Sequence, residues 1–209
     1  MLFLNKIGTV MFEQIVDILK NKSGVILIPT DTNYALAANA FDENACEKIY
    51  KIKRRELNKP LTLFISNPEE IFNYVHVNIQ QYKLLKDLID KYWPGPLNII
   101  APKASSFPKN KYIDQYSISV ACNKNKILNY IIKELDSPLV MSSANISGVK
   151  FNNLISLKQA TQDFGDMVDA IIKDDTFSSD RPSTTQSSTI ISILDGNLKV
   201  VRQGDINFF

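Results

Sequence analysis

The sequence of 209 residues has little of several residue types that many catalytic sites require. It contains one histidine, two cysteines and seven glycines, and it has neither a P-loop nor a G-x-G-x-x-G motif. A catalytic triad that needs histidine is therefore disfavoured, and His76, between Val75 and Val77, is expected to be structural. Because Cys46 and Cys122 lie far apart and no acidic cluster occurs at ligand spacing, we expect no metal site built from side chains.

Long apolar runs and a strong net charge are also absent. No segment approaches the roughly 20 apolar residues that a membrane-spanning helix needs, and the apolar run at the amino end is too short for a signal peptide. Neither cysteine belongs to a C-x-x-C pair, so we expect reduced thiols and a cytoplasmic location. The net charge of +2 provides no general affinity for nucleic acid, so any basic surface has to be local.

Apolar segments and amphipathic helical patterns alternate along the chain. The hydrophobic content of 44% can form one sizeable core, and no repeat or long linker divides the sequence. We therefore predict an α/β fold with a mixed sheet and flanking helices, in a single domain over residues 1–209. The predicted strands are 25–28, 34–38, 61–65, 97–100, 117–120 and 139–141, with a hairpin at 189–194 and 199–201. The predicted helices are 10–20, 42–52, 68–74, 82–92 and 127–135.

Residues 24–60 combine a buried strand, a polar turn and a dense cationic segment. The apolar run 25–28 lacks alternation, which predicts a strand covered on both faces, and the turn 30–32 follows it. Open α/β sheets bind ligands at the carboxyl ends of their strands. The next helix and its following loop carry six cations: Lys48, Lys51, Lys53, Arg54, Arg55 and Lys59.

The composition of this cationic segment fits two interpretations. Cations stabilise the C-terminus of any helix, so a solvated helix end would have the same composition. The position of the segment between two predicted strands favours a site for an anionic, phosphate-bearing ligand instead. In such a site Arg55 can bind phosphate oxygens in a bidentate fork, while Lys53 acts as a movable point charge.

A second polar constellation, Ser142-Ser-Ala-Asn145 with Gly148, follows the predicted strand 139–141. Small residues let backbone amides approach a ligand, and the hydroxyl and carboxamide groups form hydrogen bonds without adding charge. An ordinary turn has the same residues, because serine and asparagine dominate turns. Composition alone does not separate the two interpretations.

Six motifs occur in order along nearly the whole chain. They are Pro29-Thr-Asp-Thr-Asn-Tyr34, the segment from Ile49 to Leu61 with Lys53-Arg-Arg55, Trp93-Pro-Gly-Pro96, Ser142-Ser-Ala-Asn-Ile-Ser-Gly148, Ser188-Thr-Ile190 and Arg202-Gln-Gly204. Together they resemble the YrdC-like threonylcarbamoyl-adenylate synthases. The resemblance implies a twisted sheet with a basic concave face.

The resemblance also implies a nucleotidyltransferase that makes L-threonylcarbamoyl-AMP and pyrophosphate from L-threonine, bicarbonate or CO2, and ATP. Mg²⁺ would be held mainly through the nucleotide. The product would serve the t6A modification of tRNA, performed by downstream t6A-transfer proteins, with at most a weak contact to tRNA and none to a membrane.

The residues that would carry this chemistry follow from the matching motifs. The family's K-x-R and S-x-N signatures fall on Lys53 and Arg55, and on Ser143 and Asn145, which are the implied catalytic residues. Thr32 would contact threonine, and Ser143 and Ser188 would face its threonyl portion. The ATP side would be lined by Arg55, Lys59, Ser117, Asn145, Asn153 and Arg202.

Two positions depart from the family pattern. Ala121 stands where V-R-x-P has an arginine near the threonine, and Ala35 stands where Y-G-L-G has a glycine, which restricts the backbone beside the site. The first departure sustains one alternative, a divergent paralog that uses another amine or carbamoyl acceptor. A second alternative is a non-catalytic module that binds double-stranded RNA or tRNA through its basic concavity.

Overall fold

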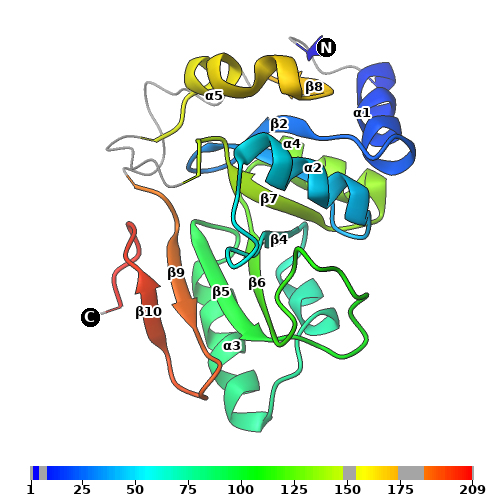
Figure 1. The fold of residues 1–209 in the computed structure, drawn as a ribbon. Coiled ribbons are helices and arrows are strands. Elements are labelled where there is room, and N and C mark those ends of the chain that lie inside the picture. Colours follow the sequence, from blue (N-terminus) through cyan, green and yellow to red (C-terminus); the bar gives the residue numbers. More distant parts are fainter. Residues whose placement is uncertain (1, 5–8, 148–153, 174–185, 209) are drawn as a thin grey trace.

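In the computed structural model the described residues are 2–4, 9–147, 154–173 and 186–208. Within these ranges ten strands form one mixed sheet in the order β1-β8-β2-β3-β7-β4-β6-β5-β9-β10 (Figure 1). The strands are β1 (Leu2–Leu4), β2 (Ile26–Pro29), β3 (Tyr34–Asn39), β4 (Thr62–Ile65), β5 (Leu97–Pro102), β6 (Ser117–Cys122), β7 (Leu139–Ser143), β8 (Ala170–Ile172), β9 (Thr189–Ser192) and β10 (Lys199–Arg202). The helices are α1 (Thr9–Asn21), α2 (Glu43–Lys53), α3 (Ile79–Tyr92), α4 (Lys126–Leu135) and α5 (Leu157–Phe164), with 3-10 turns η1 (Pro68–Asn73) and η2 (Gly165–Met167).

The predicted α/β fold with a mixed sheet and flanking helices is confirmed. Local signals account for most boundaries. Asp42 caps α2 by accepting a hydrogen bond from the amide of Ala45. Helix α3 starts at Ile79, three residues before the start predicted at residue 82, because Asn78 and Gln81 form a capping box there.

Three elements were not predicted: β1, β8 and α5. The two strands have three residues each, which is too short for a periodic pattern. They join the sheet by parallel pairing, β8 with both β1 and β2. The segment 178–188 is almost entirely serine, threonine, aspartate, proline and glutamine, a composition that predicts a surface loop. It lies outside the described residues except for its last three positions.

The two faces of the sheet are covered differently. One face packs against α2, α3 and α5 and forms the larger core, to which every strand from β2 to β9 contributes. The other face has a smaller core, in which α1 and α4 cover β8, β2, β3 and β7 and which Phe64 of β4 also contacts. Apart from Phe64, the part of this second face that belongs to β4, β6, β5 and β9 is left without a covering helix among the described residues.

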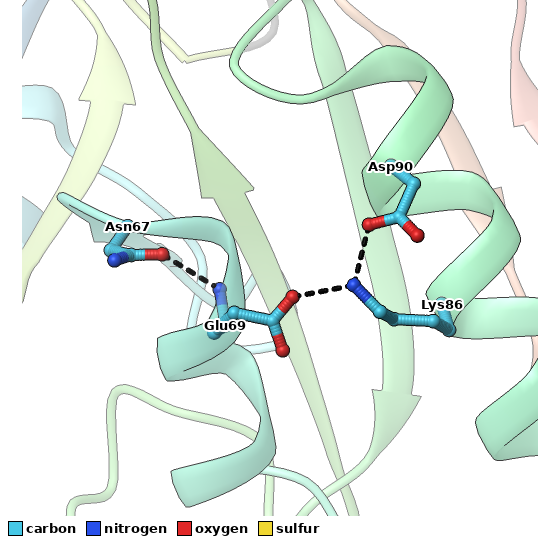
Figure 2. A network of polar contacts seen from close by, with 4 residues as sticks. All are labelled: Asn67, Glu69, Lys86 and Asp90. Atoms are coloured by element: carbon cyan, nitrogen blue, oxygen red, sulfur yellow. Dashed lines mark hydrogen bonds and ion pairs between the residues drawn. The ribbon is translucent and has the colours of Figure 1, made fainter.

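An exposed ionic network links η1 to α3 on the outside of the molecule. Figure 2 shows Lys86 between Glu69 and Asp90, with Nζ to carboxylate oxygen distances of 2.7 and 2.6 Å. Asn67 caps η1 by accepting from the amide of Glu69. The two carboxylates raise the pKa of Lys86. Because all three charged side chains are partly exposed, the network is expected to contribute little to stability.

Candidate active site

The turn between β2 and β3 is held rigid by its own first hydroxyl. Thr30 Oγ1 accepts hydrogen bonds from the amides of Thr32 and Asn33, at 3.1 and 3.0 Å, and donates to the Asn33 carbonyl at 2.7 Å. The turn residues are all buried. This is the behaviour that makes threonine favourable in turns, and it presents Thr32 at a fixed position.

Asp31 fastens this turn to the end of β6. Asn123 Nδ2 donates to its carboxylate at 2.6 Å, and Asn123 Oδ1 accepts from the Asp31 amide at 3.1 Å. Burial raises the pKa of Asp31, while hydrogen bonds from Lys124 and Asn123 act in the opposite direction. Asn123 occupies the last position of the segment that departs from the V-R-x-P pattern, so this chain uses that segment to hold the turn.

The two cations of the predicted K-x-R signature have different partners, and only Arg55 lines the cavity described below. Helix α2 ends where Arg54 takes a left-handed conformation, with φ of 51°. Lys53 is buried, and its ammonium donates to the carbonyl oxygens of Ser143 and Asn145. Burial, with a smaller effect from Arg55, lowers the pKa of Lys53 to about 7. Lys53 thus holds the backbone of the S-x-N turn through two of its carbonyl groups.

Arg55 is oriented by three hydrogen bonds. Its Nε and Nη2 donate to the carbonyls of Lys59 and Pro60, at 2.7 and 3.0 Å, and its Nη1 donates to Ser142 Oγ at 3.2 Å. The guanidinium is therefore set at the start of β4 and the end of β7. Lys59 beside it also pairs with the exposed Glu56 at 3.1 Å.

The S-x-N signature forms a small closed unit at the end of β7. Ser143 Oγ donates to Asn145 Oδ1 at 2.6 Å, and Asn145 Nδ2 donates to the Ile146 carbonyl. Ser143 lines the cavity described next. Asn145 does not belong to that lining, and its Oδ1 orients the Ser143 hydroxyl by accepting its hydrogen bond.

A cavity of about 480 Å³ lies over the uncovered part of the sheet. It contains the cations Arg55, Lys59 and Arg202, and no carboxylate belongs to its described lining. The lining comprises Thr30, Thr32, Asn33, Ala35, Arg55, Lys59, Pro60, Thr62, Phe64, Asn98, Ile100, Ser119, Met141, Ser142, Ser143, Ser187, Ser188, Ile190, Val201 and Arg202. Its concentration of positive charge and hydroxyl groups suits a polyanionic ligand.

A larger hollow of about 630 Å³ lies along residues 109–115. Its described lining mixes lysines with Glu43 and Asp114, and it contains none of the residues predicted for the site. We assign the site to the smaller cavity, because residues from five of the six sequence motifs line it.

The remaining predicted residues divide into three groups. Ser188 and Arg202 line the cavity, and Arg202 donates Nε and Nη2 to the Ser188 carbonyl, at 3.1 and 2.7 Å. Burial lowers the pKa of Arg202. Ser117 is absent from the cavity lining, and its hydroxyl donates to Asp114 instead. Asn153 lies outside the described residues.

Several lining residues were missed by sequence reasoning, among them Thr62, Asn98 and Ser119. Each is a polar residue inside an otherwise apolar strand, and alternation was the signal that could have identified them. Ser119 lies two positions after Ser117 and so shares its face of β6, but closer to the centre of the sheet.

Ala35, one of the two departures, causes no local strain. It lies within β3, paired with Ile28 and Ser143, and is not among the described non-glycine residues with positive φ. A regular strand needs no glycine, so the substitution is compatible with the site.

The described residues offer no group of three or more histidine, cysteine, aspartate or glutamate side chains that could hold a metal ion. The cavity lining has no carboxylate for Mg²⁺ either. The expectation that Mg²⁺ arrives with the nucleotide stays a prediction.

None of the described helices is both long enough and apolar enough to cross a membrane.

Comparisons with known proteins identify the family and the fold. The model of the Sua5/YciO/YrdC family, described as "Telomere recombination", matches residues 18–204. A Methanocaldococcus jannaschii protein named "Putative threonylcarbamoyl-AMP synthase" is 36% identical over 191 residues, which cover 91% of this chain and 83% of that protein.

Two solved structures share the fold. Escherichia coli YciO has a TM-score of 0.79 at 23% identity, covering 99% of this chain and 95% of that one. Pyrococcus abyssi Sua5 in complex with L-threonine has a TM-score of 0.82 at 24% identity, covering 97% of this chain. This chain spans only 57% of that Sua5 chain. From the family match and the relative at 36% identity, the chain belongs to the Sua5/YciO/YrdC family, whose members include threonylcarbamoyl-AMP synthases.

Proposed function

We propose that this protein is an L-threonylcarbamoyladenylate synthase, a nucleotidyltransferase that uses L-threonine, bicarbonate or CO2, and ATP. Its product, threonylcarbamoyl-AMP, would be passed to downstream t6A-transfer proteins for the modification of tRNA. We further propose that residues 1–209 act as one domain in the cytoplasm. The observation that carries the proposal is the cavity with three cations and no carboxylate in its described lining, beside two hydroxyl-rich turns.

The proposed reaction has two steps. The neutral amine of threonine adds to bicarbonate or CO2 to form a carbamate, with loss of water in the case of bicarbonate and release of the nitrogen's proton to solvent in the case of CO2. A carbamate oxygen then attacks the α-phosphorus of ATP, the bond from that phosphorus to the bridging oxygen breaks, and pyrophosphate leaves. The nucleophile is already an anion, so the second step requires positioning and charge stabilisation more than a strong base.

The residues of the cavity suit these requirements. Arg55, with its planar fork held by two carbonyls and the Ser142 hydroxyl, can stabilise charge on the phosphate oxygens. Lys59 and Arg202 add positive charge from two other segments of the chain. Thr32 and Ser143 offer hydroxyl groups for the threonyl portion. Lys53 would act by holding the Ser143 turn in place.

A second candidate function is a paralog that uses another amine or carbamoyl acceptor. Two observations favour it: Ala121 replaces the arginine expected near threonine, and the fold aligns with YciO over almost the full length of both chains. A non-catalytic module for double-stranded RNA or tRNA is the third, since three cations converge on one concave face.

One assay separates these functions. The protein is incubated with ATP, bicarbonate and each amino acid in turn, and pyrophosphate release is followed. Threonine-dependent release supports the synthase, and release with a different amine supports the paralog. No release with any amine, together with salt-sensitive RNA binding, supports the RNA module and contradicts both enzymes.

Arg55→Ala tests the assignment of the site. We expect pyrophosphate release to fall at least tenfold, because the substitution removes the guanidinium that faces the phosphates. Arg54→Gly is the matched control: Arg54 is exposed, lies outside the cavity lining and has a positive φ that glycine accepts. It should leave activity unchanged and raise stability by about 0.5–1 kcal/mol. Equal turnover in Arg55→Ala and wild-type protein would refute the role of Arg55.

A further inference from the structure

Four residues of the cavity lining, Phe64, Asn98, Ile190 and Arg202, belong to one row of paired residues that crosses five strands on the floor of the cavity, with the buried Ala121 between the first two. The register places Phe64 of β4 opposite Ala121 of β6, Ala121 opposite Asn98 of β5, and Asn98 opposite Ile190 of β9. Ile190 is in turn paired with Arg202 of β10. Directly paired residues lie on the same face of a sheet, so these five side chains form one row across the cavity side.

Asn98 is the polar centre of this row. Its side chain lines the cavity, yet the residue is only 8% exposed. Among the described residues its carboxamide makes no hydrogen bond. By contrast, the other polar side chains of the floor satisfy each other, since the hydroxyls of Thr62 and Ser119 lie 3.2 Å apart.

The carboxamide of Asn98 is not among the described polar atoms that are both buried and unsatisfied, so its donors and its acceptor are open to the cavity and available to a ligand. Asn110 illustrates the ordinary situation at 9% exposure. Its Nδ2 donates to the Ala40 carbonyl at 3.2 Å, and its Oδ1 accepts from the Tyr112 amide at 2.9 Å. The same residue type at the same burial is fully used by the fold in one place and left unused in the other.

The surroundings of Asn98 define what it can bind. Its neighbours in the row are Ala121 and Ile190, and no charged side chain adjoins it across either strand. The nearest cation in the row is Arg202, two strands away, which is about 10 Å between backbones. The rim of the cavity therefore suits anionic groups, whereas this part of its floor suits a neutral group that both donates and accepts hydrogen bonds.

We propose that Asn98 is a substrate-binding residue of the cavity and that its carboxamide binds a neutral donor-and-acceptor group of the substrate. The inference rests on the proposed function and deepens it. Two parts of the proposed substrates have this chemistry: the edge of the adenine ring of ATP, which an asparagine side chain can pair with in two hydrogen bonds, and the hydroxyl-bearing side chain of threonine. Asn98 is paired directly with Ala121, the position where the family pattern has an arginine, so a carboxamide stands beside the place where that pattern has a cation.

The test replaces the carboxamide by an apolar group of similar size, Asn98→Leu, in the full-length protein. Binding of ATP and of L-threonine is measured separately by calorimetry, and the KM for each is measured through pyrophosphate release. We expect at least tenfold weaker binding of one of the two, with less than a twofold change for the other. The affected ligand identifies the group that Asn98 binds.

Stability supplies the second readout. Asn98 makes no hydrogen bond within the described protein, so Asn98→Leu should unfold at the same temperature as wild type or higher. The matched control, Asn110→Leu, should unfold at a lower temperature and bind both ligands with unchanged affinity. Asn98→Asp keeps the shape, loses the donors and adds a charge, and should weaken binding like the leucine variant.

The outcomes separate this inference from the proposed function. If wild-type protein binds ATP or L-threonine and Asn98→Leu weakens that binding without turnover being detected, the inference stands and the synthase assignment fails. If Asn98→Leu binds both ligands as wild type does, the inference is overturned whatever the activity. Binding of neither ligand by wild-type protein would overturn both.

Discussion

Replacement of Lys53 by methionine should change the pH dependence of stability in a defined direction. Lys53 is 2% exposed, and burial together with Arg55 lowers its pKa from 10.5 to about 7 in the folded protein. The unfolded chain keeps this proton up to a pH near 10.5. Between the two values the unfolded state binds more protons, so the free energy of unfolding rises with pH.

The magnitude follows from the two pKa values. Titration of this one group should raise the free energy of unfolding by about 3 kcal/mol between pH 6 and pH 9, with most of the increase above pH 7. Well below pH 7 both states carry the proton, so the contribution no longer changes there. Lys53→Met abolishes the titration, and its stability relative to wild type should therefore fall by about 3 kcal/mol over the same range.

The measurement is urea unfolding of wild-type and Lys53→Met protein at pH 6, 7, 8 and 9. Lys51→Met is the matched control, because Lys51 lies on the same helix with a 71% exposed side chain, in a surface pair with Glu47. It should follow the wild-type pH profile. Parallel profiles for Lys53→Met and wild type would refute the reasoning, since they would mean that the ammonium stays charged in the native state.

Two further substitutions test the supports of the cavity. Thr30→Val should lower the free energy of unfolding by about 2–4 kcal/mol, because it leaves two buried amides without their acceptor. Thermal unfolding measures this loss of stability. A loss below about 0.5 kcal/mol would contradict the assigned hydrogen bonds. Gly204→Ala would place a Cβ 2.3 Å from the Ser187 carbonyl oxygen and 2.6 Å from the Thr189 amide. The backbone of residues 187–189 must then move, so calorimetry should detect weaker ATP binding. Gly196→Ala is the comparison: a Cβ at Gly196 meets no atom within 4 Å, and this variant should bind ATP normally.

Much of the fold was predictable from local patterns. The strand and helix predictions from residue 10 to residue 141 correspond to observed elements, because hydrophobic periodicity and caps such as Asp42 act within a few residues. The elements that were missed are short strands at 2–4 and 170–172 and the helix at 157–164. Three-residue strands acquire their structure from the partner strands that flank them, which no local pattern records.

The site was predictable in part. Thr32, Arg55, Lys59, Ser143, Ser188 and Arg202 were predicted from motifs and line the cavity. Ser117, on the correct face of β6, lies too far along the strand, and its neighbour Ser119 lines the cavity instead. The direction of Lys53 was also beyond prediction, because its carbonyl partners, Ser143 and Asn145, are 90 and 92 residues away in the sequence.

The sequence by itself determined which segments become strands and helices, the order of the motifs, and through them the family. These are properties of short stretches, in which periodicity, caps and turn residues act locally. Tertiary structure alone decided which strands pair, which part of the second face α1 and α4 leave uncovered, and therefore that Asn98 faces a cavity without a partner. The reason is physical: alternation places a side chain on one of two faces, but pairing between distant strands and the reach of the covering helices decide whether that face is filled or open.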